Sequence, residues 1–184
     1  NYGYLYTSSD SGDTWTERRP DSAQQRWLSI ASSSDGTKLV AGTNNNYIYT
    51  SSDSGATWTQ RISCNCYAVT SSSDGTKLAA GAYPGSIYTS SDSGVTWTTR
   101  TAAGSRNWNS IASSADGTNL AAAAYNNHIY TSSDSGVTWD QVTDSVVAGA
   151  AGTTTALWRS ITSSADGTKL ATAVPAGYLY TGTK

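Results

Sequence analysis

Short runs in which apolar and polar residues alternate recur along the whole chain, and turn residues separate them. In the best-defined repeat these runs are 27–32, 38–41, 47–50 and 57–61. Alternation with a period of two indicates half-buried β-strands, because successive side chains of a strand point to opposite faces. No segment keeps the 3.6-residue period of a helix over a useful length. The pattern predicts an all-β chain whose repeating unit has four strands.

Two motifs repeat in phase with these strands. The octapeptide Ser-Ser-Asp-Ser-Gly-x-Thr-Trp occurs four times, at 8–15, 51–58, 90–97 and 132–139. Relatives of Ser-Ile-Ala-Ser-Ser-Ser-Asp-Gly-Thr-Lys-Leu occupy 29–39, 68–78, 110–120 and 160–170. A period of about 40 residues with strand-like content is typical of one β-propeller blade.

The acidic residues of both motifs have a structural interpretation. Asp-Gly pairs favour hairpin turns, because glycine adopts a positive φ at no steric cost. An aspartate in the octapeptide turn accepts hydrogen bonds from nearby backbone N–H groups, and the tryptophan then returns to the sheet and buries a large apolar area. We therefore expect these octapeptide residues to stabilise turns: Asp10, Asp53, Asp92 and Asp134.

The octapeptide resembles the Asp-box, or BNR, repeat of sialidase-like β-propellers. Similar repeats occur in secreted glycosidases, sortilin-type receptors and photosystem assembly factors. The resemblance implies that each box forms the hairpin between the third and fourth strands of a blade, on the face away from the ligand. It covers the whole chain and is specific for the fold. It does not identify a function, because the box is scaffold in all these proteins.

The strand count predicts a single domain over residues 1–184, a small β-propeller of four-stranded blades. The first strand of the repeat occurs four times and the third strand five times, which favours four blades. The terminal strands would then close the ring or pair with a neighbouring molecule, and the surplus strand is 4–7 or 178–181. A five-bladed ring with two incomplete blades is the alternative.

Composition limits the partners. The formal net charge is −2 and there is no basic stripe, so we expect no nucleic-acid partner. No apolar run has the length of a membrane span. Charged residues make up only 13% of the chain, and a surface rich in Ser, Thr, Gly, Ala and Tyr suggests a secreted or cell-surface location. Because the chain has no Met, it is interpreted as a processed form or part of a longer product.

The two cysteines, Cys64 and Cys66, are separated by one residue. A disulfide would close a ring too short for ordinary geometry unless strained, so the preferred interpretation is two small buried or free thiols. A strained Cys-x-Cys redox pair is a weaker alternative. Metal binding is weaker still, because the single His128 is far away in the sequence. We expect neither a metal nor a cofactor.

Connections that differ between the repeats are the candidate ligand-binding segments, because variable loops on a repeated scaffold usually carry binding. Asn amides pair with sugar hydroxyls, and Tyr rings stack on the C–H faces of sugars. Ordinary turn chemistry is the competing explanation, since Asn favours turns. The candidates are Asn44, Asn45, Asn46, Tyr83, Tyr125, Asn126, Asn127 and His128.

A second group of candidates surrounds the predicted axis. Three first strands begin with tryptophan, for which we prefer core packing between blades to sugar stacking. Three arginines flank these positions and form the only arrangement compatible with an anionic ligand. The group is Trp27, Trp108, Trp158, Arg26, Arg106 and Arg159.

A hydrolytic site has few candidates. Glycoside hydrolysis normally needs two carboxylates that face one bond, and outside the turns only Glu17, Asp21, Asp140 and Asp144 are available. We therefore predict a non-catalytic extracellular recognition module that binds carbohydrate, with glycans or an extracellular polymer as partner. The alternative is a structural building block of a coat, wall or filament that self-associates through a terminal strand. A sialidase-like glycoside hydrolase is third.

Overall fold

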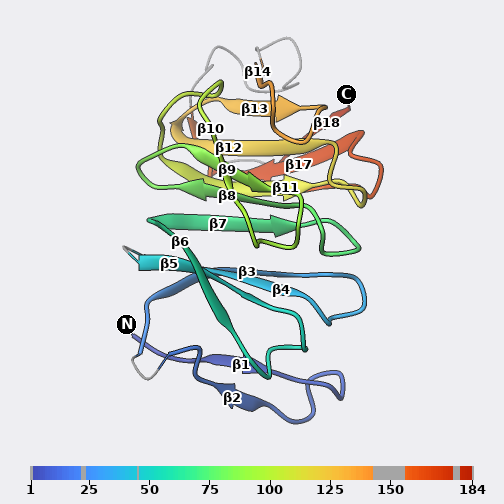
Figure 1. Ribbon diagram of the computed structural model, residues 1–184. Helices are drawn as coiled ribbons and strands as arrows, with labels where there is room; N and C mark the ends of the chain where they lie inside the picture. The colour runs from blue at the N-terminus through green and yellow to red at the C-terminus, as the bar shows by residue number, and fades with distance from the viewer. Residues whose placement is uncertain (1, 22–23, 45, 143–155, 176–178, 184) are drawn as a thin grey trace.

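The computed structural model describes residues 2–21, 24–44, 46–142, 156–175 and 179–183. This part of the chain forms five antiparallel β-sheets and no helix, and it accordingly contains no helix able to cross a membrane. The sheets follow one another from the N-terminus to the C-terminus (Figure 1).

Three sheets are complete blades with strands in sequence order. The first complete blade contains β3 (Trp27–Ser32), β4 (Leu39–Thr43), β5 (Asn46–Ser51) and β6 (Thr59–Cys64). The second contains β7 (Cys66–Ser71), β8 (Leu78–Ala82), β9 (Ile87–Ser90) and β10 (Thr98–Arg100). The third contains β11 (Trp108–Ser113), β12 (Leu120–Asn127), β13 (Ile129–Ser132) and β14 (Asp140–Gln141).

The other two sheets have fewer strands. At the N-terminal end, β1 (Leu5–Thr7) pairs with β2 (Thr16–Arg18). At the C-terminal end, β16 (Ser160–Ser163), β17 (Lys169–Ala173) and β18 (Leu179–Thr183) form one sheet. A short strand, β15 (Ala156–Leu157), pairs with the end of β12.

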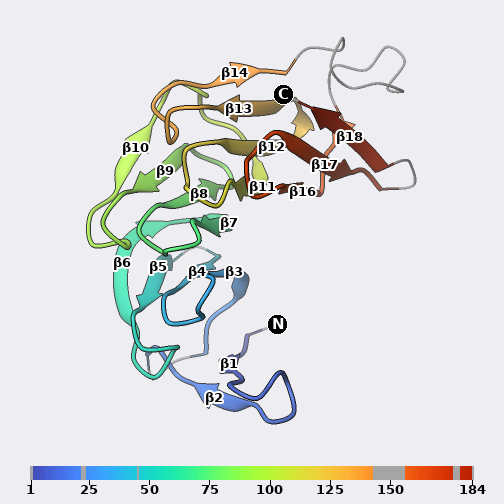
Figure 2. The same ribbon diagram turned by 90° about the vertical axis from the view of Figure 1, so that its right-hand side faces the viewer.

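The blades form an open arc. Figure 2 shows the first strands β3, β7, β11 and β16 on the inner side, with β6, β10 and β14 on the outer side. The expected closure of a single ring is not present among the described strands. Instead, β1 pairs only with β2, and β18 pairs only with β17. Figure 2 shows the N-terminal and C-terminal sheets apart, on opposite sides of the opening of the arc.

Small residues let neighbouring blades approach closely. The second strands β4, β8 and β12 are rich in buried alanine and glycine. A Cβ atom on Gly81 would lie 2.6 Å from Cβ of Trp108, and one on Gly42 would lie 2.6 Å from the carbonyl oxygen of Cys66. Real Cβ atoms do not come so close, so glycine is required where the next blade's first strand packs.

The octapeptide turns have the hydrogen bonds expected for structural aspartates. In the second copy, the backbone N–H and hydroxyl groups of Thr57 donate to the two carboxylate oxygens of Asp53. Ser51 Oγ donates to the same carboxylate and accepts from the Gly55 N–H group. The Trp58 indole N–H group donates to the Gly55 carbonyl at 3.0 Å. Equivalent bonds surround Asp10, Asp92 and Asp134.

The aspartates of these turns are ionised, but they belong to the turns and not to a functional site. Hydrogen bonds from the threonine side chain, then its backbone N–H group, lower the pKa of each octapeptide aspartate to about 2. In the Asp-Gly turns the largest cause is a serine hydroxyl, and the pKa is again lowered to about 2 for Asp35, Asp74, Asp116 and Asp166. Such groups stay ionised at neutral pH and cannot supply a proton.

Candidate functional site

Three tyrosines from two neighbouring blades form a row at the ends of the inner strands. The rings of Tyr67 and Tyr83 stack with centroids 4.6 Å apart and an interplanar angle of 24°. Tyr125 continues the row, with its centroid 6.3 Å from that of Tyr83 and a tilt of 55°. All three side chains are half-buried. Part of each ring is therefore exposed to solvent and available to a ligand.

Backbone hydrogen bonds position two of these tyrosines. The Tyr83 N–H group donates to the Asn65 carbonyl, and the Tyr125 N–H group donates to the Asn107 carbonyl, both at 2.8 Å. In each case the bond joins the C-terminal end of a blade's second strand to the residue directly before the first strand of the same blade. No hydrogen bond to the phenol oxygens of the three tyrosines is present among the described residues. Those hydroxyl groups are available to donate to a ligand.

A cation ends the row. The Arg159 guanidinium lies over the Tyr125 ring, with Cζ 5.0 Å from the centroid. Arg159 is exposed and belongs to the next blade, directly before β16. Within the described residues the one ion pair joins Arg19 to Glu17, so no described carboxylate pairs with Arg159.

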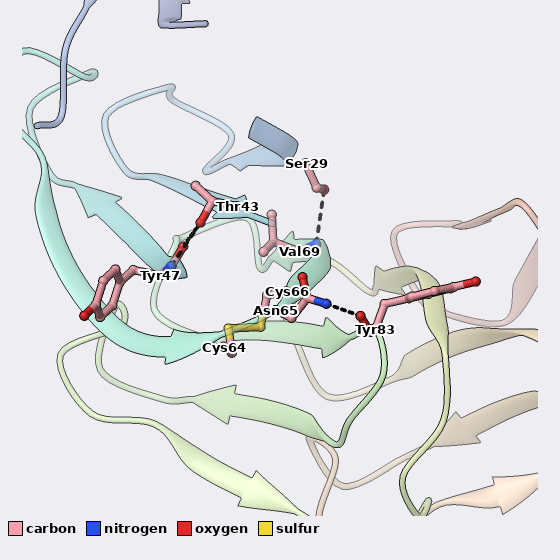
Figure 3. Close-up of a disulfide and its surroundings, with 8 residues drawn as sticks. All are labelled: Ser29, Thr43, Tyr47, Cys64, Asn65, Cys66, Val69 and Tyr83. Carbon is pink, nitrogen blue, oxygen red and sulfur yellow. Dashed lines mark hydrogen bonds between the residues drawn. A yellow bond between two sulfur atoms is a disulfide. The ribbon is translucent and has the colours of Figure 1, made fainter. Parts of the chain in front are cut away.

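A disulfide lies close to Asn65, the residue hydrogen-bonded to Tyr83 of the row (Figure 3). Cys64 and Cys66 are bonded, with an S–S distance of 2.03 Å, and the prediction of two thiols is wrong. The cysteines do not share one strand: β6 ends at Cys64 and β7 begins at Cys66, so the chain changes direction at Asn65. This brings the Cα atoms to 5.3 Å, within the range of disulfides. Both cysteines are buried.

The disulfide encloses the residue that holds Tyr83. Besides accepting from the Tyr83 N–H group, Asn65 donates from its side-chain amide to the Tyr83 carbonyl. Figure 3 shows this bond beside the two sulfur atoms. Cys66 also precedes Tyr67 in β7, so one short segment positions both rings of the stacked pair, Tyr67 and Tyr83.

The predicted Asn segments do not form one loop cluster. Asn44 is half-buried, Asn45 lies outside the described residues, and Asn46 begins β5. Residues 125–127 were expected in a loop, but β12 runs through Asn127. The physical reason is the pairing of β15 with this end of β12, which extends the strand.

The two polar side chains at this end of β12 have local structural roles. Asn126 is exposed with a φ of 53°, whereas Asn127 accepts from the Trp158 indole through its carbonyl and from the His128 N–H group through its side chain. The His128 Nδ1 atom is buried and has no hydrogen-bond partner among the residues that the structure describes. His128 packs edge-on against Tyr130. Of the predicted loop residues, only Tyr83 and Tyr125 belong to the aromatic row.

The three tryptophans at the start of the first strands lie at the joints, where neighbouring blades pack against each other. Trp108 and Trp158 are buried, and Trp27 is half-buried. Each indole N–H group donates to a carbonyl of the preceding blade: Trp27 to Gly3, Trp108 to Gly85 and Trp158 to Asn127. The structure thus places them in the packing between blades.

The structure separates the three flanking arginines. Arg106 is half-buried, donates to the Tyr130 hydroxyl at 2.8 Å and lies over the Tyr130 ring. Arg26 is exposed, and its carbonyl accepts from Asn44. Only Arg159 adjoins the tyrosine row.

The remaining acids are dispersed. Glu17 lies in β2 at one end of the arc, and its pKa is lowered by hydrogen bonds from Arg19 and Tyr6. Asp21 accepts from Tyr49 and Gln25. Asp140 is exposed in β14, and Asp144 lies outside the described residues. No cluster of metal-ligating side chains is found in the described part of the chain.

Tyr67 was missed by the sequence analysis. It lies inside a predicted strand, whereas the predicted ligand-binding residues lie in variable connections. A signal was present: the equivalent first-strand position holds Leu28, Asn109 and Arg159 in the other repeats, so this position varies as much as the loops do.

Antiparallel four-stranded sheets follow one another in the order of the sequence, and their first strands lie on the inner side of the arc. This arrangement defines a β-propeller fold. No family model and no curated protein matches this chain. Solved structures with similar folds are propellers at low identity. YCF48 bound to D1 peptide has a TM-score of 0.68 at 16% identity, over 98% of this chain and 57% of that one. The Cps50 (Swd1) β-propeller domain of Myceliophteria thermophila has a TM-score of 0.69 at 15% identity, over 100% and 63%.

An ancestral GH74 enzyme is also similar, with a TM-score of 0.68 and 16% identity over 97% of this chain and 25% of that one. The chain therefore spans less than two thirds of the length of these structures. Because a binding protein and an enzyme share the fold, the likeness establishes the architecture alone.

Proposed function

We propose that the protein is a non-catalytic carbohydrate-recognition module of the Asp-box propeller class, with the tyrosine row as its binding surface. The observation that carries the proposal is the contiguous row of Tyr67, Tyr83 and Tyr125. Partly exposed aromatic rings offer flat apolar faces for sugar C–H groups, and their phenol hydroxyls pair with sugar hydroxyls. Tyr67 and Tyr125 lie on strands, and Tyr83 lies in the turn directly after β8, where its backbone is hydrogen-bonded to Asn65; these contacts keep the surface preorganised.

Two further observations support the class and the location. The hydrogen-bonded octapeptide turns resemble those expected of Asp-box scaffolds. The Cys64–Cys66 disulfide favours a secreted or cell-surface protein, because disulfides persist in oxidising compartments. The dispersed carboxylates favour binding over hydrolysis, since Glu17 and Asp140 lie in separate sheets.

Peptide recognition is the competing outcome, because one structural neighbour was solved with a bound peptide. A glycan array followed by calorimetry on the best oligosaccharide separates the two. We expect binding to an oligosaccharide, and a roughly 5- to 150-fold weaker affinity for Tyr83→Ala, because loss of an aromatic stacking partner costs on the order of 1–3 kcal/mol. Tyr83→Phe should retain most of the affinity.

Tyr2→Ala is the matched control, since Tyr2 is 71% exposed and lies at the N-terminal end of the arc, away from the row on the middle blades. It should bind like the unmodified protein. No array signal, or equal loss in Tyr2→Ala and Tyr83→Ala, would contradict the carbohydrate proposal. A peptide that binds in a Tyr83-dependent way would replace it.

A second candidate, a structural building block, is favoured by the two ends of the arc. Trp15 is 62% exposed at one end and Leu179 is 82% exposed at the other. The third-strand positions β1 and β18 each keep one edge without a described partner strand, and such edges and apolar faces promote association.

A further inference from the structure

We infer that the tyrosine row selects acidic saccharides, and that Arg159 binds the anionic group of the sugar. This inference rests on the proposed function and adds the chemical class of the ligand. It assigns to Arg159 a specificity-determining role in contact with the ligand.

The first step concerns the position of the charge. Arg159 lies over Tyr125, so a saccharide stacked along Tyr83 and Tyr125 would reach the guanidinium at the end of the row. The cation is fixed at its base: its backbone N–H group donates to the Ala173 carbonyl at 3.0 Å, and its carbonyl accepts from Asn109. The head of the side chain is exposed.

The second step concerns its availability. The guanidinium makes no side-chain hydrogen bond and no ion pair with the described residues. Four other arginines differ in this respect: Arg18, Arg61 and Arg100 each donate to a threonine hydroxyl, and Arg106 donates to Tyr130. Arg159 is therefore the arginine beside the row whose donors are free for a ligand.

The third step concerns ligand chemistry. The planar guanidinium presents paired N–H donors that match a carboxylate or a sulfate ester. No described acid faces Arg159, so an anionic sugar would meet no paired carboxylate there. A neutral sugar could stack on the same rings but would form no ionic contact with the Arg159 guanidinium.

Calorimetry with three probes tests this: hexagalacturonate, its fully methyl-esterified form and a sulfated galactan hexasaccharide. The ester keeps the sugar ring and removes the charge. We expect an acidic probe to bind roughly tenfold more tightly than the ester, as for a hydrogen bond to a charged group. Arg159→Gln should abolish that difference by weakening the binding of the acidic probes. Preference between carboxylate and sulfate identifies the source of the charge.

Arg19→Gln is the control, because Arg19 also lies over a tyrosine, Tyr4, and its loss changes the net charge equally. It should keep the preference for acidic sugars. Equal binding of acidic and esterified probes, or an equal effect of both arginine variants, overturns the inference while Tyr83-dependent binding of the ester preserves the proposed function. Binding of none of the probes, together with a silent glycan array, rejects both. Tighter, Arg159-dependent binding of an oligoglutamate peptide reassigns the ligand to acidic peptides and overturns the sugar assignment.

Discussion

The tryptophan that ends each octapeptide turn has a different environment in the first and fourth copies. Trp15 is 62% exposed, whereas Trp139 is 9% exposed. Both indoles donate to the glycine carbonyl of their own turn. The difference lies in the neighbour: the Cβ position of Gly136 faces Thr89 of the preceding blade, but that of Gly12 meets only Trp15. Burial is therefore set by the joint between blades and not by the motif.

This difference predicts unequal costs for the same substitution. Trp139→Ala should lower the free energy of unfolding by about 3–5 kcal/mol, as expected for a buried tryptophan. Trp15→Ala should lower it by less than about 1 kcal/mol, because an exposed side chain loses little packing. Urea denaturation followed by far-ultraviolet circular dichroism measures both. Equal shifts of the two midpoints would show that the turn itself, rather than the joint, accounts for the stability.

At the scale of the strand and its connections, the sequence pattern correctly predicted the features that depend on residues close together in the chain. The run 27–32 is β3, and the Asp-Gly and octapeptide turns have the predicted hydrogen bonds. The errors came from contacts between distant segments. β12 is longer than predicted because β15, about 30 residues later, pairs with it. Likewise, stacking of Tyr67 on Tyr83 depends on the pairing of β7 with β8, so Tyr67 is marked only by comparison between the repeats and not by its own neighbours in the sequence.

The connection between β6 and β7 gives a prediction at this scale. Replacing both cysteines, Cys64→Ala and Cys66→Ala, should lower the stability by about 1–2 kcal/mol, the chain-entropy value for so short a loop. It should also weaken oligosaccharide binding, because Asn65 would no longer be held against the Tyr83 carbonyl. Asn65→Ala keeps the disulfide and removes the amide bond, and it should lose affinity as well. Unchanged affinity in both variants would show that the tyrosines are positioned without this connection.

At the scale of the whole molecule, the joints between neighbouring blades repeat the same contacts. Each end of the arc presents one half of such a joint. Between blades, backbone bonds of 2.7 Å connect successive Asp-Gly turns, from Ser34 to Ser73, from Ser73 to Ala115 and from Ala115 to Ala165. Inside the arc a glycine of each later octapeptide turn packs on a threonine of the preceding third strand, as Gly55 does on Thr7. The last third strand, β18, has an equivalent position at Thr181.

Because the two ends complement each other as neighbouring blades do, we predict that the 184-residue chain associates end to end. Light scattering coupled to gel filtration should give a mass that rises with concentration. Trp15→Lys and Leu179→Lys should each reduce that mass, since each places a charge on an apolar end face. Val95→Lys is the control, because Val95 is 61% exposed in an octapeptide turn of a complete blade. A constant monomer mass at millimolar concentration would reject the building-block function and leave carbohydrate recognition untouched, because the tyrosine row lies on the middle blades.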